Sequence, residues 1–335
     1  MQIQNDISLK EFNTFGIDVK AKEYISISSN EQLKNLLETR KEVFVLSGGS
    51  NVLLTKSPDK LVVHLNTKGK KIEQLDNGNV LVTVQAGENW HEFVLWCIDK
   101  GFGGLENLSL IPGNVGTCPI QNIGAYGSEV KDTITKVSTI EIATEKIVEF
   151  SNEACCFGYR NSIFKQDAKG KYIITAVSFE LTKSNHQLNY SYGAIQSQLN
   201  ERSINNPTIK DISDVVIAIR NSKLPNPKEI GNCGSFFKNP VVPKSLFEEI
   251  KKNHPNIPHY EVSETEIKIP AGWLIENAGF KGKRYGNTGA HKNQALVLVN
   301  YGEATGNEVV AMATKIQKEI AVRFGISLEV EVNIL

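Results

Sequence analysis

The stretch GNCGSFFKNP, residues 231–240, combines residue types that ordinary turns and strands keep apart. The glycines suit a turn, but two large aromatic residues contribute little to one. A buried strand would accept Phe236 and Phe237 but not the polar residues among them. The mixture indicates a rigid backbone that presents the hydroxyl of Ser235 to a ligand or a reacting group. A structural serine in a turn is the alternative.

Two glycine-rich loops could bind an anion or a flat ring. SGGSN, residues 47–51, follows the apolar run EVFVL. Its consecutive glycines let main-chain N–H groups approach a pyrophosphate, although a tight turn explains this loop equally well. IPGNVGTCPIQNIGAYG, residues 111–127, is too long and too poor in charge for a typical solvated connection. Its rigid backbone suits the covering of a flat, partly apolar ring, and a buried connection or a flexible lid are the alternatives.

The composition is that of an ordinary globular protein. A length of 335 residues suggests two or three domains, and 40% of the residues are hydrophobic. Lysine plus arginine equals aspartate plus glutamate, 37 against 37, so no global field favours nucleic acid. The five cysteines have no metal-ligand spacing, and neither a signal peptide nor an apolar run of membrane-spanning length is present. We therefore expect a reduced, cytoplasmic protein with no metal, no nucleic-acid partner and no membrane contact.

Strands and helices alternate along the first part of the chain. SSNEQLKNLLETR predicts a helix whose capping box begins at Ser28 or Ser29, and ENWHEFVLWCIDKG predicts an amphipathic helix ending at Gly101. GFGGLE resembles part of a dinucleotide fingerprint, but Glu106 occupies the last glycine position and a helix precedes it, so no Rossmann site is expected. Alternating or continuous apolar runs predict strands at EVFVL, KLVVHL, NVLVTVQAG, KVSTIEIAT, KIVEFS and KYIITAVSFEL.

The second half of the chain predicts a smaller domain. DISDVVIAIRNSKLPNP predicts a helix opened by Asp211 or Ser213, and the following LPNPKEIGNCG is the best candidate for a domain boundary. NEVVAMATKIQKEIAVRFG predicts a helix with an apolar stripe, ended by Gly325. Because this helix lies between the apparent strands ALVLVN and LEVEVNI, we expect a β–α–β unit here.

Several motifs together carry a family resemblance. The two glycine-rich loops, with FGYRNSIF, SKLPNP, GSFFKNP, AGWLIENAGFKG, HKNQALVLVN and LEVEV, resemble the UDP-N-acetylenolpyruvoylglucosamine reductase (MurB) family nearly end to end and in the family's order. The resemblance implies an α+β fold with a two-subdomain FAD-binding unit of the vanillyl-alcohol-oxidase type, over residues 1–65 and 66–220, the second carrying a substrate loop. A smaller α/β substrate-binding domain over residues 221–335 would follow.

The resemblance also implies an activity. The chain would use NADPH to reduce non-covalently bound FAD, and then pass hydride to UDP-N-acetylglucosamine enolpyruvate to form UDP-N-acetylmuramate for peptidoglycan synthesis. The implied partner is this small UDP-sugar, and a monomer is expected. By the same resemblance, FAD would contact Ser47, Gly48, Gly49, Ser50, Asn51, Pro112, Gly113, Gly116, Ile120, Gln121, Asn122, Gly124, Ala125 and Tyr126.

Three residues match the family's catalytic positions. Ser235 matches the proton donor, and an alcohol can serve as the acid because the enolate that it protonates is a strong base. Arg160 matches the arginine that stabilises developing negative charge, since a guanidinium fork suits a carboxylate, although an arginine in this context alone is more often a surface residue. Glu331 matches the active-site glutamate. Alternation alone does not choose between Glu331 and Glu329, and both could instead lie on the solvated face of an edge strand.

Four further residues match substrate contacts. Tyr192 would lie over the nucleotide, and Tyr190 is an alternative for that role. The other three matches are Lys223, which would contact a diphosphate, Asn239, which follows Lys238, and Gln294. Asn161 stands where the family usually has aspartate, and Cys118 and Cys233 replace residues that are commonly smaller or inert.

Two other functions remain as alternatives. One is a related FAD-dependent sugar or alcohol oxidase or dehydrogenase, and the other is a UDP-sugar-binding protein without turnover. The pairing of Ser235 with Glu331 argues against an oxidase, because an oxidase needs a base that removes a proton rather than an acid that supplies one.

Overall fold

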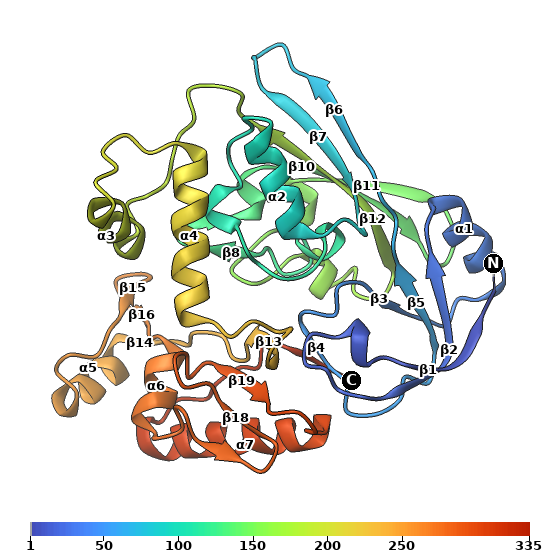
Figure 1. The fold of residues 1–335 in the computed structure, drawn as a ribbon. Helices are drawn as coiled ribbons and strands as arrows, with labels where there is room; N and C mark the ends of the chain where they lie inside the picture. Colours follow the sequence, from blue (N-terminus) through green and yellow to red (C-terminus); the bar gives the residue numbers. More distant parts are fainter. Residues whose placement is uncertain (1) are drawn as a thin grey trace. The chain divides into compact units, whose positions relative to one another are not determined.

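The structure is a computed structural model that describes residues 2–335, and the chain divides into two compact units (Figure 1). The first unit contains residues 2–7, 21–48 and 58–220, and the second contains residues 8–20, 49–57 and 221–335. Two short N-terminal segments therefore belong to the unit built mainly from the C-terminal third. The predicted domain bounds, 1–65, 66–220 and 221–335, stay a prediction. Within residues 2–335, no helix combines the length and the apolar character that crossing a membrane requires.

A four-stranded sheet with the order β1-β2-β5-β3 occupies the N-terminal part of the first unit. Its apolar strand β5 pairs in parallel with both β2 and β3, as expected for a strand buried between neighbours. Helix α1 packs Leu33 and Leu37 against this sheet. Ser29 caps α1 by accepting a hydrogen bond of 3.2 Å from the Gln32 N–H, which confirms the predicted start. The bounds are β1 Gln4–Ser8, β2 Lys20–Ile27, α1 Asn30–Thr39, β3 Val43–Leu46 and β5 Leu61–Leu65.

An antiparallel five-stranded sheet with the order β11-β10-β12-β7-β6 carries the largest core of the first unit. Helix α2 packs on it through Trp90 and Phe93, whose rings lie 6.0 Å and 5.2 Å from that of Phe179. Val115 and Ile123 belong to the same core, so parts of the long loop 111–127 are packed against the sheet and the loop is not a solvated lid. The bounds are β6 Lys70–Gln74, β7 Val80–Gln85, α2 Trp90–Asp99, β10 Ile134–Glu141, β11 Ile147–Ser151 and β12 Tyr172–Leu181.

Helices α3 (Gly193–Glu201) and α4 (Ile209–Lys223) share a small core of their own. The prediction that Asp211 or Ser213 opens α4 is wrong. Thr208 caps the helix, because its hydroxyl accepts a 3.2 Å hydrogen bond from the Asp211 N–H while Asp211 accepts one of 2.8 Å from the Thr208 N–H. Ser213 is buried and bonds the hydroxyl of Ser109 instead. The reciprocal pair at 208 and 211 is a capping box with aspartate in the acidic position.

The second unit contains a sheet of order β13-β19-β18-β17 and another of order β14-β16-β15. The apolar stripe of α7 is buried as predicted, and Gly325 ends the helix with φ +66°. Thr305 and Glu308 form its capping box. The bounds are β13 Gly231–Ser235, β14 Val241–Pro243, α5 Lys244–Asn253, β15 Tyr260–Glu261, β16 Glu266–Lys268, α6 Ala271–Asn277, β17 Arg284–Tyr285, β18 Thr288–Ala290, β19 Val297–Asn300 and α7 Gly306–Phe324.

The predicted β–α–β unit around α7 is wrong. Strand β20, Asn333–Ile334, is much shorter than LEVEVNI suggests, and it pairs in parallel with β4, Val52–Leu53, instead of joining the sheet of β19. Among residues 2–335, the strand pairing of Val330 is an isolated bridge with Phe237. The alternation is real, since Leu328 and Val332 are buried, but the partner of the final strand comes from the N-terminal segment 49–57.

Gly49 is one position where the second unit requires glycine. Its φ is +56°, and a Cβ there would lie 2.1 Å from the carbonyl oxygen of Phe12. We expect Gly49→Ala to lower the free energy of unfolding by about 3 kcal/mol, because strain and overlap add. Gly170→Ala is the matched control, since Gly170 has φ +72° but no atom within 4 Å of an added Cβ. Urea unfolding of both variants measures the difference, and equal losses would contradict the steric contribution.

Candidate active site

The two glycine-rich loops meet in the first unit. Ser47 and Gly48 follow β3 directly, and a Cβ on Gly48 would lie 2.9 Å from the Cα of Gly113. The Oγ of Ser47 is buried and has no hydrogen-bond partner among residues 2–335. Because an unpaired buried hydroxyl is costly, a ligand atom that accepts its hydrogen bond would stabilise the site. A phosphate oxygen of FAD is such an acceptor, so these residues fit the predicted pyrophosphate loop.

The first part of the long loop is fixed against the start of α2. Gly113 accepts a 3.0 Å hydrogen bond from the Trp90 N–H, and the Gly116 N–H donates one of 2.9 Å to Ala86. A Cβ on Gly116 would lie 2.5 Å from the Cβ of Ala86, so only glycine allows this approach. Pro112 is exposed at the beginning of this segment. The boundary between the two units crosses the shorter glycine-rich loop after Gly48. Its residues Gly49, Ser50 and Asn51 belong to the second unit.

The second part of the long loop forms a small hairpin. Strands β8, Gly124–Ala125, and β9, Ser128–Glu129, pair antiparallel. Tyr126 and Gly127 between them have φ +51° and +79°, the combination that a type I′ turn requires. Before the hairpin, Ile120 accepts a 2.6 Å hydrogen bond from the Ser162 hydroxyl, and Gln121 is half-buried.

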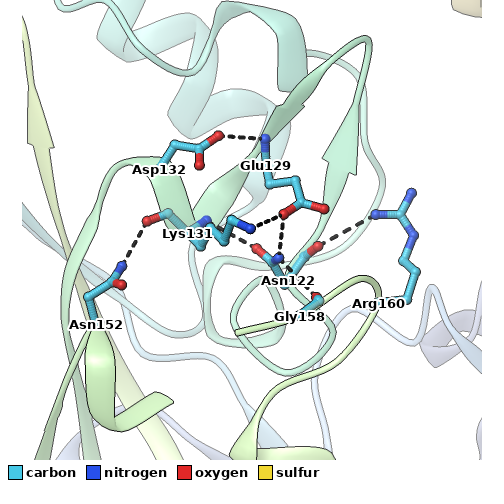
Figure 2. Close-up of polar contacts among 7 residues, drawn as sticks. All are labelled: Asn122, Glu129, Lys131, Asp132, Asn152, Gly158 and Arg160. Atoms are coloured by element: carbon cyan, nitrogen blue, oxygen red, sulfur yellow. Dashed lines mark hydrogen bonds and ion pairs between the residues drawn. The ribbon is translucent and has the colours of Figure 1, made fainter. Parts of the chain in front are cut away.

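Arg160 lies against this hairpin (Figure 2). Its Nη2 donates a 2.7 Å hydrogen bond to the carbonyl of Gly124, and its Nη1 lies 3.5 Å from the carbonyl oxygen of Asn122. Arg160 has φ +52° in a turn that Gly158 and Asn161 close with two main-chain hydrogen bonds. The structure therefore brings the predicted catalytic arginine to the predicted flavin loop. The Asn161 side-chain oxygen accepts a hydrogen bond from Gln166.

Arg220, on α4, is a further candidate that the sequence reasoning missed. Its Nε donates a 3.2 Å hydrogen bond to Leu110. Burial raises the pKa of the Tyr126 phenol, and the nearby charge of Arg220 partly offsets that rise. Burial lowers the pKa of Arg220, and the nearby charge of Arg160 lowers it further. Two guanidinium groups and one phenol thus gather where an anion could bind. The signal was present, because Arg220 is four residues after the buried Val216 and lies on the apolar face of its helix.

Tyr192 is exposed, and its ring meets that of Tyr126 edge-on at 5.6 Å. Tyr190 instead packs into the small core of α3 and α4. Asn107 links the two segments, since its side-chain amide donates to the carbonyls of Tyr126 and Asn189 at 3.1 and 2.7 Å. This arrangement favours Tyr192 over Tyr190 as a residue that contacts a ligand.

A β-bulge presents Ser235 in the second unit. The pairing of β13 with β19 shifts register between Asn232 and Ser235, where Gly234 has φ +74°. A bulge of this kind redirects the side chain that follows it. Phe236 and Phe237 are buried, whereas Ser235 is exposed, and within residues 2–335 its hydroxyl has no hydrogen-bond partner. The aromatic pair anchors the backbone and leaves the hydroxyl available, as the sequence pattern predicts.

The two candidate glutamates differ in their surroundings. Glu329 is exposed and forms an ion pair with Lys238. Glu331 is half-buried, and its N–H donates a 2.9 Å hydrogen bond to Phe236, the residue after Ser235. Burial raises the pKa of the Cys233 thiol well above its ordinary value, and the Glu331 charge raises it further, so this carboxylate lies near Cys233. The geometry favours Glu331.

Cys118 and Cys233 carry no sign of reactivity. Burial raises the pKa of the Cys118 thiol well above its ordinary value, as it does for Cys233. A thiol that resists ionisation is a poor nucleophile, so both residues fill space in their cores.

Two predicted substrate contacts lie at the start of α6. The Asn239 side-chain oxygen accepts a 2.9 Å hydrogen bond from the Ala271 N–H. The Gln294 side-chain oxygen lies beside Gly272, where a Cβ would come within 2.9 Å of it. Lys223 is exposed at the end of α4. The second unit thus holds Ser235, Glu331 and the three substrate candidates, whereas Arg160 and Tyr192 belong to the first.

Comparison with known proteins finds two family models that match different parts of the chain. A family model described as "FAD binding domain" matches residues 22–151, and one described as "UDP-N-acetylenolpyruvoylglucosamine reductase, C-terminal domain" matches residues 226–335. A curated reductase of that name from Flavobacterium johnsoniae is 58% identical to this chain, with 100% of both sequences covered. One from Pseudomonas putida is 45% identical, covering 100% of this chain and 99% of its own length.

A solved structure shares the fold. MurB from Thermus caldophilus superposes with a TM-score of 0.71 at 22% identity, over 100% of this chain and 99% of its own. These matches define an FAD-binding oxidoreductase with a separate C-terminal domain, and they confirm the predicted α+β fold class. The chain belongs to the UDP-N-acetylenolpyruvoylglucosamine reductase family.

Proposed function

We propose that this chain catalyses the NADPH-dependent reduction of UDP-N-acetylglucosamine enolpyruvate to UDP-N-acetylmuramate, in peptidoglycan precursor synthesis. Full-length similarity to reductases of this name, at 58% and 45% identity, carries the proposal. The match to an FAD-binding domain and the exposed hydroxyl of Ser235 support it. The cytoplasmic location stays a prediction, as does the monomeric state.

Both glycine-rich loops would hold FAD. The unpaired Oγ of Ser47 and the close approach of Gly48 to Gly113 support a pyrophosphate at this point. Gly124, Ala125 and Tyr126 would lie along the ring system. When bound, FAD would supply the hydride chemistry between NADPH and the terminal carbon of the enolpyruvyl group.

Arg160 would stabilise the negative charge that hydride addition leaves on the enolpyruvyl carboxylate. A guanidinium pairs well with an enolate oxygen, and the carbonyl of Gly124 fixes its direction. Arg220 would add a second positive charge, since its pKa is lowered by burial and by the charge of Arg160, and its Nε is held by Leu110. Groups held in place before the reaction stabilise the transition state without reorganising.

Ser235 would then donate its proton to the carbon next to the carboxylate. An alcohol is a weak acid toward water but an adequate one toward an enolate, provided that its position is fixed. The bulge at Gly234 and the buried pair Phe236 and Phe237 support that fixation. Glu331 would act beside Ser235, and the UDP-sugar would contact Tyr192, Lys223, Asn239 and Gln294.

The visible spectrum of the purified protein under anaerobic conditions tests the proposal. We expect a flavin spectrum that NADPH bleaches and that UDP-N-acetylglucosamine enolpyruvate restores. UDP-N-acetylglucosamine, which lacks the enolpyruvyl group, is the control and should leave the flavin reduced. A colourless protein that stays inactive after FAD is added would overturn the proposal. Recolouring by oxygen but not by the sugar would indicate an oxidase, and sugar binding without NADPH consumption a binding protein.

A further inference from the structure

Asn122 has a side chain that is committed to other parts of the protein. It is fully buried and has φ +45°, a conformation that asparagine tolerates better than most residues. Its Nδ2 donates to Glu129 Oε2 at 2.9 Å and to the carbonyl of Gly158 at 3.1 Å, and its Oδ1 accepts from the Lys131 N–H at 3.1 Å. Figure 2 shows these contacts radiating from Asn122. Because both amide N–H bonds have protein acceptors, its side chain has no donor left for a cofactor.

Glu129 holds Asn122 in this orientation. The same Oε2 that accepts from Asn122 also accepts an ion-pair contact of 2.8 Å from Lys131 Nζ. Asp132 fixes the backbone of Glu129 by accepting a 3.0 Å hydrogen bond from its N–H. Asn152 in turn donates to the Lys131 carbonyl at 2.7 Å. The Glu129 carboxylate thus contacts both Asn122 and Lys131, while Asp132 and Asn152 hold the backbone of Glu129 and Lys131 (Figure 2).

This network ends at the turn that carries Arg160. Gly158, which accepts from Asn122, exchanges two main-chain hydrogen bonds of 3.0 and 3.1 Å with Asn161. Arg160 lies inside that turn and reaches back to the carbonyls of Asn122 and Gly124. A Cβ on Gly124 would lie 3.2 Å from Arg160 Nη1 and 3.0 Å from Glu129 Cγ. The guanidinium and the Glu129 side chain therefore flank the same glycine.

We propose that Asn122 and Glu129 are positioning residues for the Arg160 guanidinium. Glu129 orients the amide of Asn122, the amide holds the Gly158–Asn161 turn, and the carbonyls of Asn122 and Gly124 aim the guanidinium. This inference rests on the proposed function for the role of Arg160. It also revises the role of Asn122, since its side chain serves the protein and not the flavin.

Removal of the Glu129 carboxylate leaves a buried amide N–H of Asn122 without its acceptor. Such a group reorients to find another partner, which loosens the contact with Gly158. A displacement of the guanidinium by about 1 Å is enough to lower a rate about 100-fold. The loss must appear in the step that uses Arg160, so it falls on reoxidation of the flavin by the enolpyruvyl sugar.

The experiment is a double-mutant cycle on the holoenzyme. Glu129→Ala is expected to slow flavin reoxidation by the enolpyruvyl sugar about 10- to 100-fold, with reduction by NADPH within about twofold of wild type. In an Arg160→Ala background the same change should cost less than about twofold, because the group through which it acts is gone. Glu129→Gln keeps an acceptor for Asn122 and should restore most of the rate. Glu149→Ala, which removes an exposed acid of the same unit, is the control.

Two readouts do not depend on turnover. The dissociation constant for FAD should stay within about twofold in Glu129→Ala, because the network does not bind the flavin. Hydrogen exchange at the amides of Gly158 and Asn161 should become faster, since their turn has lost its support. Each of three results would overturn the inference. Hydrogen exchange could stay unchanged, Glu129→Ala could slow reoxidation in the Arg160→Ala background as much as in wild type, or Glu129→Gln could be as slow as Glu129→Ala. A wild-type protein that the sugar does not reoxidise would instead overturn the proposed function.

Discussion

Ser235→Ala is expected to slow flavin reoxidation by the enolpyruvyl sugar about 100- to 10,000-fold while leaving reduction by NADPH within about twofold of wild type. The first half-reaction moves hydride only and needs no proton from this hydroxyl. The second creates an enolate that must be protonated, and Ser235 is exposed on a bulge with no protein partner among the described residues for its hydroxyl. Anaerobic stopped-flow absorbance measures the two half-reactions separately.

The matched control is Ser245→Ala, which removes an exposed serine from α5 in the same unit. It should change neither half-reaction. Thermal unfolding checks that Ser235→Ala is folded, and little change is expected because Phe236 and Phe237 supply the buried contacts of this segment. Equal losses in both half-reactions would mean that the serine is structural and that the proton comes from elsewhere.

Arg160→Lys is expected to lower kcat/KM for the enolpyruvyl sugar about 100- to 1,000-fold, the range for losing an aimed donor at a developing charge. Lysine keeps the positive charge but cannot reproduce a planar fork whose Nη2 donates to Gly124. Both residues must adopt the left-handed conformation at this position, where φ is +52°, so the backbone cost is similar. Steady-state kinetics with varied sugar, together with anaerobic half-reactions, measure the effect.

Arg202→Lys is the control for this change, since Arg202 is an exposed arginine at the end of α3 in the same unit. It should leave kcat/KM unchanged. If Arg160→Lys lost thermal stability but kept its rate with the sugar, the guanidinium would serve the hairpin and not the substrate. A rate loss confined to NADPH oxidation would likewise contradict the proposed role.

The helices were predictable where their signals are local. Ser29 before the leucines of α1, and Gly325 after the stripe of α7, act within one or two turns of the same segment. The predicted start of α4 at Asp211 or Ser213 is wrong because Asp211 is the acidic partner of the cap, Thr208, and residue preference alone does not separate these two roles. The final strand was misplaced because its partner, β4, lies about 280 residues earlier, a distance that no local pattern reports.

The sequence indicated which residue types belong to the candidate site, but not how the fold arranges them in space. The alternation of polar and aromatic residues around Ser235 correctly indicated an exposed hydroxyl on a buried frame, but the bulge that aims it depends on pairing with β19. Arg220 was missed because a single arginine on a helix is common, even on the apolar face. Its hydrogen bond to Leu110 and the nearby charge of Arg160 arise only in the folded chain. The use of the Asn122 side chain likewise depends on Glu129 and Gly158, which meet it only in the folded chain.

The interleaving of the two units limits how this protein can be dissected. The family match to the C-terminal domain begins at residue 226, yet the second unit also includes residues 8–20 and 49–57. A fragment cut at that match would lose β4, and with it the only ladder neighbour that β20 has among the described residues. It would also lose Asn51, whose carbonyl accepts hydrogen bonds from Asn333 at 3.1 and 3.0 Å. During synthesis, β4 therefore cannot pair with β20 until residues 333 and 334 have been made.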